Sequence, residues 1–308
     1  MKKIKTVFVV GPTASGKTGL GIRIAKKYNG EIISADSMQI YKGIHIASAA
    51  PDEEEMQGIP HHLLEFLDLS ESFSVADYVI KARDCIKEIN SREKLPIVVG
   101  GTGLYVSALL DNTFFLDEDT DYELRRELEK DFDKIGGEGM LEKLAEIDPE
   151  TAEKLHPNNR HRIIRAFEVY KLTGKTITEQ NYLSHKEESF IEPLVIGITY
   201  RDREKLYERI NKRVDIMLEN GLLQEAKTTF SHKGGTGAFQ AIGHKELYGY
   251  FKGEQSLNEA AELLKQQTRR YAKRQLTWWR KDQRVNWIYA DEVENLSESF
   301  EELLNEFF

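Results

Sequence analysis

The feature that most constrains the fold of this chain is a glycine-rich segment near its start. The segment fits the pattern GxxxxGK followed by Ser or Thr, and its residues are Gly11, Pro12, Thr13, Ala14, Ser15, Gly16, Lys17 and Thr18. The buried-strand pattern Thr6–Val10 precedes it, and the amphipathic pattern Leu20–Lys27 follows it. In such a strand–loop–helix unit, backbone N–H groups face inward and the helix N-terminus contributes about half a positive charge. The segment therefore predicts a phosphate-binding loop rather than an ordinary glycine turn.

The loop leaves the identity of the phosphate compound open. We expect Lys17 to reach the outer phosphates and the hydroxyl of Thr18 to bind Mg²⁺. The guanine-recognition motif NKxD is absent from the sequence. A Walker-B aspartate is indistinct, because both Asp36 and Asp68 follow apolar runs. These observations argue against an ordinary motor ATPase.

Short apolar runs alternate with amphipathic stretches through the first hundred residues. Besides Thr6–Val10, we expect strands at Ile32–Ile33, Leu63–Leu67 and Ile97–Val99, and a helix at Ala76–Ile89. Strands and helices in alternation are typical of βαβ units. The pattern therefore predicts a mostly parallel sheet.

Near residue 113 the strand patterns stop. From about residue 117 to residue 180 the chain is charged and helical, with Leu124, Leu128 and Phe132 on one helix face. Gly136–Gly137 is expected to break this helix, and Asn158 to cap a later one. These residues predict a helical insertion.

Strand patterns then return at Leu194–Thr199 and Asn286–Tyr289, on either side of a long helical pattern at Leu257–Arg280. Together the patterns predict an α/β fold with a P-loop NTPase-like core and a mostly parallel sheet. We expect the core to comprise residues 1–112 and 191–308, and the all-helical insertion domain to comprise residues 113–190.

Composition limits the environment of the protein. No apolar run approaches the roughly 18 residues of a membrane span, and a single cysteine, Cys85, excludes an internal disulfide framework. We therefore expect a cytoplasmic protein without a membrane partner.

The net charge is −9, but Lys265–Arg284 holds eight basic residues and one acid. A basic stripe on an acidic chain is a local footprint for a polyanion.

Polar groups follow two of the expected strands where those strands end. Asp36 comes after the second strand, and Gly100–Gly103, which includes Thr102, comes after another. In open α/β sheets, ligands bind beyond these carboxyl ends. Asp36 could act as a general base or Mg²⁺ partner, or it could simply form an Asx turn. The glycines could let a ligand approach the backbone, or they could form only a turn into the next helix.

The long helix near the C-terminus mixes cations with aromatic residues. Arg270, Arg274 and Lys281 lie close to one face, whereas Leu264, Tyr271 and Trp278 recur every seven residues and are expected to face the core. The basic face could bind RNA phosphates, or it could be a solvated helix face. A second basic group lies in the expected insertion and consists of Arg160, His161, Arg162 and Arg165. Two separate basic groups favour a polyanionic partner.

Taken together, the motifs resemble the tRNA dimethylallyltransferase family, also called tRNA isopentenyltransferases. The resemblance covers about residues 5–290 and lies in an ordered set of motifs: GPTASGKT at 11–18, ADSMQIY at 35–41, HH at 61–62, GGTGLY at 100–105, HPNN at 156–159, QAIGHKE at 240–246 and KRQLTWWR at 273–280. The family commonly has tyrosine where this chain has His244.

The resemblance implies transfer of a dimethylallyl group from its diphosphate to N6 of adenosine 37, in tRNAs reading codons that begin with U. The diphosphate- or nucleotide-binding loop would then hold an isoprenoid diphosphate with Mg²⁺ at Thr18. An exocyclic adenine amine is a poor nucleophile, so a base is needed, and Asp36 is our candidate. Lys17, Thr102 and Arg213 complete the implied catalytic set.

The resemblance also implies a tRNA-binding set that grips the anticodon arm and holds the target base. It consists of Asp36, Ser37, Met38, Gln39, Thr102, Arg125, Arg162, Arg165, Lys273 and Arg274. No protein partner is indicated by the sequence. Two other interpretations remain open from the motifs alone: a small-molecule P-loop kinase, which would bind ATP tightly, and a non-catalytic RNA-binding or GTPase-like switch, which would not need Asp36.

Overall fold

The computed structural model describes residues 2–113, 115, 121–184, 188–231, 239, 241–293 and 296–308. The chain forms two compact units: a core unit of Met1–Leu110 and Phe190–Phe308, and a helical unit of Asp111–Ser189. Residues 117–120 and Gln240, which belong to the patterns above, lie outside the described residues.

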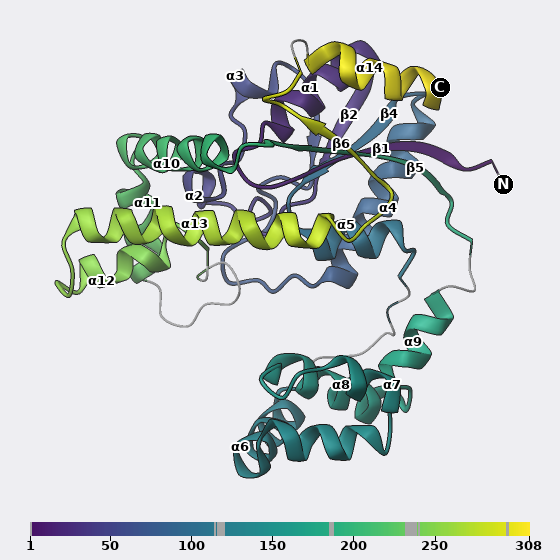
Figure 1. The fold of residues 1–308 in the computed structure, drawn as a ribbon, viewed down its shortest axis with the longest axis vertical. Helices are drawn as coiled ribbons and strands as arrows, with labels where there is room; N and C mark the ends of the chain where they lie inside the picture. Colours follow the sequence, from purple (N-terminus) through teal and green to yellow (C-terminus); the bar gives the residue numbers. More distant parts are fainter. Residues whose placement is uncertain are drawn as a thin grey trace. The chain divides into compact units, whose positions relative to one another are not determined.

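The core unit contains a six-stranded sheet in the order β3-β2-β4-β1-β5-β6 (Figure 1). Neighbouring strands pair in parallel, with Val7 of β1 opposite Ile97 of β4 on one side and Leu194 of β5 on the other. The strands are β1 Ile4–Val10, β2 Gly30–Ser34, β3 His61–His62, β4 Leu95–Gly100, β5 Ile191–Thr199 and β6 Val285–Tyr289. The parallel sheet and the phosphate-loop connection confirm the predicted fold class.

Helices cover both faces of this sheet. On one face, α1 (Lys17–Lys27) and α14 (Leu296–Phe307) bury alternate strand residues, including Val7 and Val9. The helices α4 (Val75–Ser91) and α5 (Gly103–Leu110) contact one another, and α4 contacts β1, β2 and β4. Phe8 and Val98, which alternate with the first set, are also fully buried. Strands buried on both faces read as continuous apolar runs, which explains why their positions could be predicted.

The remaining helices of the core unit lie beyond the carboxyl ends of the strands. The long helix α13 begins with a capping box formed by Ser256 and Glu259, and it packs against α10, α5 and the 3₁₀ helix η2. The bounds are α2 His45–Ser48, α3 Glu53–Met56, α10 Arg203–Glu219, α11 Leu222–Ser231, η2 Lys245–Leu247, α12 Tyr248–Phe251 and α13 Leu257–Trp279.

Two local predictions for the core unit are wrong. Leu63–Leu67 is not a strand, because Leu63 and Glu65 have φ values of 57° and 44°, which a β-strand excludes. Only Leu67 forms an isolated bridge, to Tyr41. The seven-residue stripe of α13 also fails at its end. Leu264 is buried, but Trp278 is 39% exposed and Trp279 enters the core instead, because a straight helix drifts about 20° per heptad.

The described part of the helical unit consists of helices: α6 Tyr122–Ala145, α7 Pro149–Lys154, α8 Arg160–Thr173 and α9 Ile177–Ser184. Gly136 interrupts α6 with φ 72° and ψ 176°, as its sequence predicted. The unit has its own core around Leu128, Leu144 and Ile163. The N-cap of α8 is Asn159 rather than the predicted Asn158, and the Oδ1 of Asn159 accepts a hydrogen bond from the His156 N–H.

Across both units, the described helices include none that is long and apolar enough to cross a membrane.

Candidate active site

The phosphate loop connects β1 to α1, and two of its glycines are required by its geometry. Gly11 and Gly16 have φ values of 143° and 101°, a region that residues with a side chain rarely adopt. A Cβ on Gly11 would lie 2.3 Å from the carbonyl oxygen of Ile198 on β5. Because Gly16 directly precedes α1, the first N–H groups of that helix border the loop. The loop therefore has the conformation of an anion cradle.

Lys17 lies in this loop beside a second cation. Its Nζ donates a hydrogen bond of 2.7 Å to the carbonyl of Pro12. Burial and, next, the charge of Arg213 lower the pKa of Lys17 to about 7, against the opposing charge of Asp36. A positive site with this much repulsion favours a bound anion.

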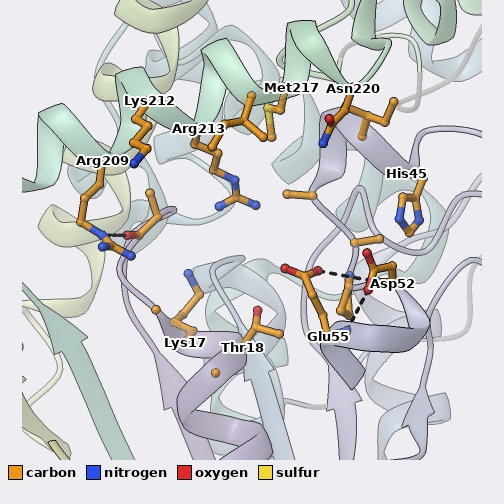
Figure 2. A pocket seen from close by; sticks show the side chains of 18 residues that line it. Lys17, Thr18, His45, Asp52, Glu55, Arg209, Lys212, Arg213, Met217 and Asn220 are labelled. Carbon is orange, nitrogen blue, oxygen red and sulfur yellow. Dashed lines mark hydrogen bonds between the residues drawn. The ribbon is translucent and has the colours of Figure 1, made fainter. Parts of the chain in front are cut away.

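Helix α10 forms the opposite wall of the loop. Arg213 donates to the hydroxyl of Thr13 at 3.2 Å, and Arg209 donates to the carbonyl of Ala14 at 3.0 Å. Figure 2 shows Arg209, Lys212 and Arg213 reaching from α10 towards Lys17. These residues line a cavity of about 610 Å³, with Thr18 on its floor and Glu55 on a further wall. The cavity has room for a diphosphate and more.

A second cavity, of about 240 Å³, adjoins the first and shares Arg213 and Met217 with it. Its polar lining includes Asp36, Ser37, Thr268, Tyr271 and Arg274, and its apolar lining includes Met38, Ile210, Val214, Met217, Ala241, Ile242 and Leu264. One end of the combined space thus suits phosphate, and the other suits an apolar or aromatic group next to a carboxylate.

Asp36 follows β2 and forms the Asx turn that the sequence left as one alternative. Its Oδ1 accepts a hydrogen bond of 2.9 Å from the Met38 N–H. The same carboxylate lines the second cavity. The turn and the chemical role are therefore compatible, since the turn fixes the orientation of the carboxylate.

Thr102 is brought to Asp36 because β4 lies next to β2 in the sheet. Its N–H donates to the carbonyl of Ala35, and its Oγ1 accepts from the Ser37 N–H at 3.0 Å. A Cβ on Gly100 would lie 2.1 Å from the Ala35 oxygen, so this glycine permits the two strand ends to approach. The glycines at this strand end are therefore needed for packing.

Comparisons with known proteins agree with this geometry. A family model described as IPP transferase matches residues 39–282. A tRNA dimethylallyltransferase of Acetivibrio thermocellus is 52% identical over 93% of this chain and 92% of its own. The chain belongs to the IPP transferase family.

Solved structures extend this assignment over nearly the whole chain of the transferase. The tRNA isopentenylpyrophosphate transferase of Bacillus halodurans is 44% identical with a TM-score of 0.72, covering 99% of this chain and 95% of its own. A eukaryotic dimethylallyltransferase, described as acting on tRNA, is 31% identical with a TM-score of 0.82. That likeness covers 99% of this chain and 79% of the other.

The structure of the transferase brings part of the predicted residue set together. Lys17, Arg213 and Asp36 interact electrostatically, and Thr102 contacts Ser37. Gln39, predicted to hold a base, has its side-chain oxygen bonded to Ser34 and its amide nitrogen bonded to the carbonyls of Ser48 and Ala49. Gln39 therefore ties β2 to α2.

The predicted basic residues are divided between the two units of the transferase. Lys273 and Arg274 are exposed on α13 in the core unit. In the helical unit, Arg125 and Arg165 lie 3.7 and 3.8 Å from oxygens of the buried Glu168, and Arg162 is exposed. Glu168 thus holds two of these arginines in place.

Sequence reasoning missed Gln275, which joins the phosphate loop to the Thr102 segment. This buried side chain accepts from the Thr13 N–H at 2.8 Å and donates to the carbonyl of Gly101 at 3.0 Å. The only sequence signal for Gln275 was its position within the motif KRQLTWWR. The basic residues of that motif indicated phosphate binding, not a buried side chain that joins two loops.

The sequence also left the contacts of His244 open. His244 is fully buried, with Nε2 2.8 Å from Glu225 Oε1 and Nδ1 3.1 Å from Thr229 Oγ1. The Glu225 carboxylate accepts from the N–H groups of Ile46 and Ala47, at the start of α2. His244 therefore supports a segment that lines both cavities.

Proposed function

We propose that this enzyme transfers a dimethylallyl group from dimethylallyl diphosphate to N6 of adenosine 37, in tRNAs reading codons that begin with U, and releases diphosphate. The observation that carries the proposal is the pair of adjoining cavities that share Arg213. One has the phosphate loop and three cations of α10, and the other has a carboxylate and an apolar wall. The relatives, which are named tRNA dimethylallyltransferase or described as acting on tRNA, indicate the tRNA and the dimethylallyl group.

The donor would place its diphosphate in the larger cavity. The loop N–H groups, Lys17 and Arg213 would neutralise its charge, and the short allyl chain would extend towards Val214 and Met217. Mg²⁺ fits at Thr18, because hydroxyl and phosphate oxygens are hard ligands that this ion prefers. The described residues hold no cluster of three metal-binding side chains, so phosphate and water would supply most ligands. When bound, Mg²⁺ would stabilise negative charge on the departing diphosphate.

The transfer itself would form a bond between N6 and the allylic carbon as the bond from that carbon to the diphosphate oxygen breaks. The electron pair of the broken bond stays on the diphosphate, where Lys17 and Arg213 meet it. Asp36 would accept the proton that N6 loses. Thr102, fixed against Ser37, would contact the reacting centre beside this carboxylate.

The acceptor base must leave its stack to enter the smaller cavity. Ser37 and Met38 line that cavity and would hold the base. Cations at the surface, four of them exposed and Arg125 half-buried, would bind the phosphates of the anticodon arm, positioning it without reading its sequence. They are Lys273 and Arg274 of the core unit and Arg125, Arg162 and Arg165 of the helical unit. With tRNA as acceptor, we place the enzyme in the cytoplasm.

A transfer assay tests this function. The protein is mixed with Mg²⁺, labelled dimethylallyl diphosphate and unmodified tRNA carrying adenosine at positions 36 and 37, and the digested nucleosides are identified by mass. We expect label on N6 of adenosine 37, and none in a matched tRNA with guanosine at that position. Tight ATP binding with phosphate transfer and no prenylated nucleoside would instead identify a kinase.

A further inference from the structure

Trp278 is a large aromatic residue that α13 does not bury. Its neighbour Trp279 is fully buried, but Trp278 is 39% exposed. Exposure of an indole loses the stabilisation that burial would provide. The position therefore calls for a role other than core packing.

Two contacts with α5 hold the indole of Trp278 in one orientation. Its Nε1 donates a hydrogen bond of 2.9 Å to Ser107 Oγ. Its five-membered ring lies directly over Gly103, where an added Cβ would be only 2.6 Å from Cδ1 of the indole. A side chain fixed in this way has little rotamer freedom left to lose when it binds a partner.

Trp278 also lies close to the active site. Arg274, one helical turn before it on α13, lines the smaller cavity, as does Tyr271. The helix α5 that carries Gly103 and Ser107 begins directly after Thr102, and it contacts α13 (Figure 1). Lys273 on α13 and Lys281, just after the end of that helix, are exposed cations in the same stretch of chain. The indole is thus a fixed apolar surface one helical turn from Arg274, a cation that lines the cavity.

We propose that Trp278 is a stacking platform for the nucleobase that adjoins the target adenosine, an inference that rests on the proposed function. Flipping a base out of the anticodon loop removes a stacking partner from its neighbour. Aromatic side chains bind unstacked RNA bases on their π-face, beside cations that bind the backbone. The indole of Trp278 replaces the partner that the neighbour has lost.

The first test measures binding of a fluorescent anticodon stem-loop to the full-length enzyme. Trp278→Ala should weaken binding about 5- to 100-fold, whereas Trp278→Phe and Trp278→Tyr should recover most of the affinity. Ser107→Ala, which keeps the indole but frees its orientation, should give a smaller loss. The salt dependence of binding should be unchanged in Trp278→Ala, because no charge is removed. Ile80→Ala, at an apolar position on α4 that is 59% exposed, should bind normally.

The second test identifies the base. Stem-loops with an abasic site at either neighbour of position 37 are compared in wild type and Trp278→Ala. With one of these two abasic stem-loops, Trp278→Ala should bind as tightly as the wild type. Binding of dimethylallyl diphosphate serves as the folding control and should not change. Trp278→Ala binding within about twofold of wild type, or an equal loss with every stem-loop, would overturn the stacking role alone. Failure of the wild type to bind any stem-loop would overturn the proposed function with it.

Discussion

At the scale of single residues, the site is organised around positive charge placed close together. Burial lowers the pKa of both Lys17 and Arg213, and a neighbouring cation adds to the shift in each case: Arg213 for Lys17, and Arg209 for Arg213. Unliganded, this arrangement is unfavourable, because each cation loses solvation and faces a like charge. An anion of high charge density would relieve both effects, so we expect the loop to prefer diphosphate.

This arrangement makes diphosphate binding depend on pH. The pKa of Lys17 is about 7, so above that pH the free enzyme has lost the proton, and a bound diphosphate raises the pKa and restores it. Binding should then take up protons, and affinity should fall by up to about tenfold per pH unit above 7. Calorimetry at pH 8 in two buffers of different ionisation enthalpy would show the uptake. In Lys17→Arg, which cannot titrate, the two buffers should give equal heats; equal heats in the wild type would contradict the prediction.

The base role of Asp36 can be separated from its turn. Asp36→Asn keeps an oxygen to accept the Met38 N–H but cannot take a proton at neutral pH. We expect the transfer rate to fall by about 10² or more, with little change in tRNA affinity. Asp36→Ala, which also removes the turn, should lose at least as much. Single-turnover rates at saturating tRNA provide the measurement, and near-normal turnover in Asp36→Asn would exclude Asp36 as the base.

Residues whose position follows from a local sequence pattern could be predicted, whereas residues that make contacts between distant parts of the chain could not. The phosphate loop, Asp36 and Thr102 each follow a strand pattern, so their positions at the sheet edge follow from the topology rule. Gln275 contacts Thr13 and Gly101, which are far away in sequence. No periodicity in a single sequence encodes such a contact. The side chain of Gln39 likewise looked available until its partners Ser34 and Ser48 were known.

At the scale of elements, the edge of the sheet carries a buried carboxylate with two cationic neighbours and a histidine. Glu31 on β2 receives hydrogen bonds from Arg92 at 2.7 Å and Lys94 at 2.8 Å, and lies 2.6 Å from His62 on β3. Burial alone would raise the pKa of Glu31, but these hydrogen bonds outweigh it and hold the pKa at about 2. The cluster joins the short edge strand to the start of β4.

The cluster should stabilise the fold in a pH-dependent way. The folded pKa of Glu31, about 2, lies below the reference value of 4.5, so its stabilisation is present above pH 4.5 and is lost between pH 4.5 and 2. Glu31→Gln should lower the free energy of unfolding by about 3 kcal/mol at pH 7 and by much less at pH 3. Urea titrations of both proteins at the two pH values provide the test. A difference that does not shrink at pH 3 would mean that packing, not charge, is responsible.

The basic face of α13 should contribute through charge alone. The double variant Lys273→Ala with Arg274→Ala should weaken tRNA binding and reduce the slope of log affinity against log salt by about two. A matched double variant on α1, Arg23→Ala with Lys26→Ala, removes two exposed charges from another helix and should leave the slope unchanged. Filter binding between 50 and 200 mM salt, roughly the range over which such slopes are resolved, gives both values. An unaltered slope in the α13 variant would show that this face does not contact RNA phosphates.

At the scale of the whole molecule, the two units are folded separately. The helical unit has its own buried cluster around Leu144 and Ile163, and the core unit buries Val7 and Phe300 in another. The sequence indicated this division because strand patterns stop at residue 113 and return at 194. Such a change in periodicity reflects which elements share a core. It can therefore be recognised from a single sequence, whereas individual side-chain contacts cannot.

Separate cores predict that the helical unit can be removed without unfolding the rest. We expect a variant with residues 111–189 replaced by a Gly/Ser linker to retain the sheet and the phosphate loop, because both belong to the core unit. It should bind dimethylallyl diphosphate within about threefold of the full chain, and it should lose most tRNA affinity, since Arg125, Arg162 and Arg165 are removed. Calorimetric titration with each ligand measures the two affinities, and circular dichroism checks the fold. A variant that binds tRNA as well as the full chain would show that Lys273, Arg274 and their neighbours on α13 suffice for the acceptor, and that the helical unit serves another purpose.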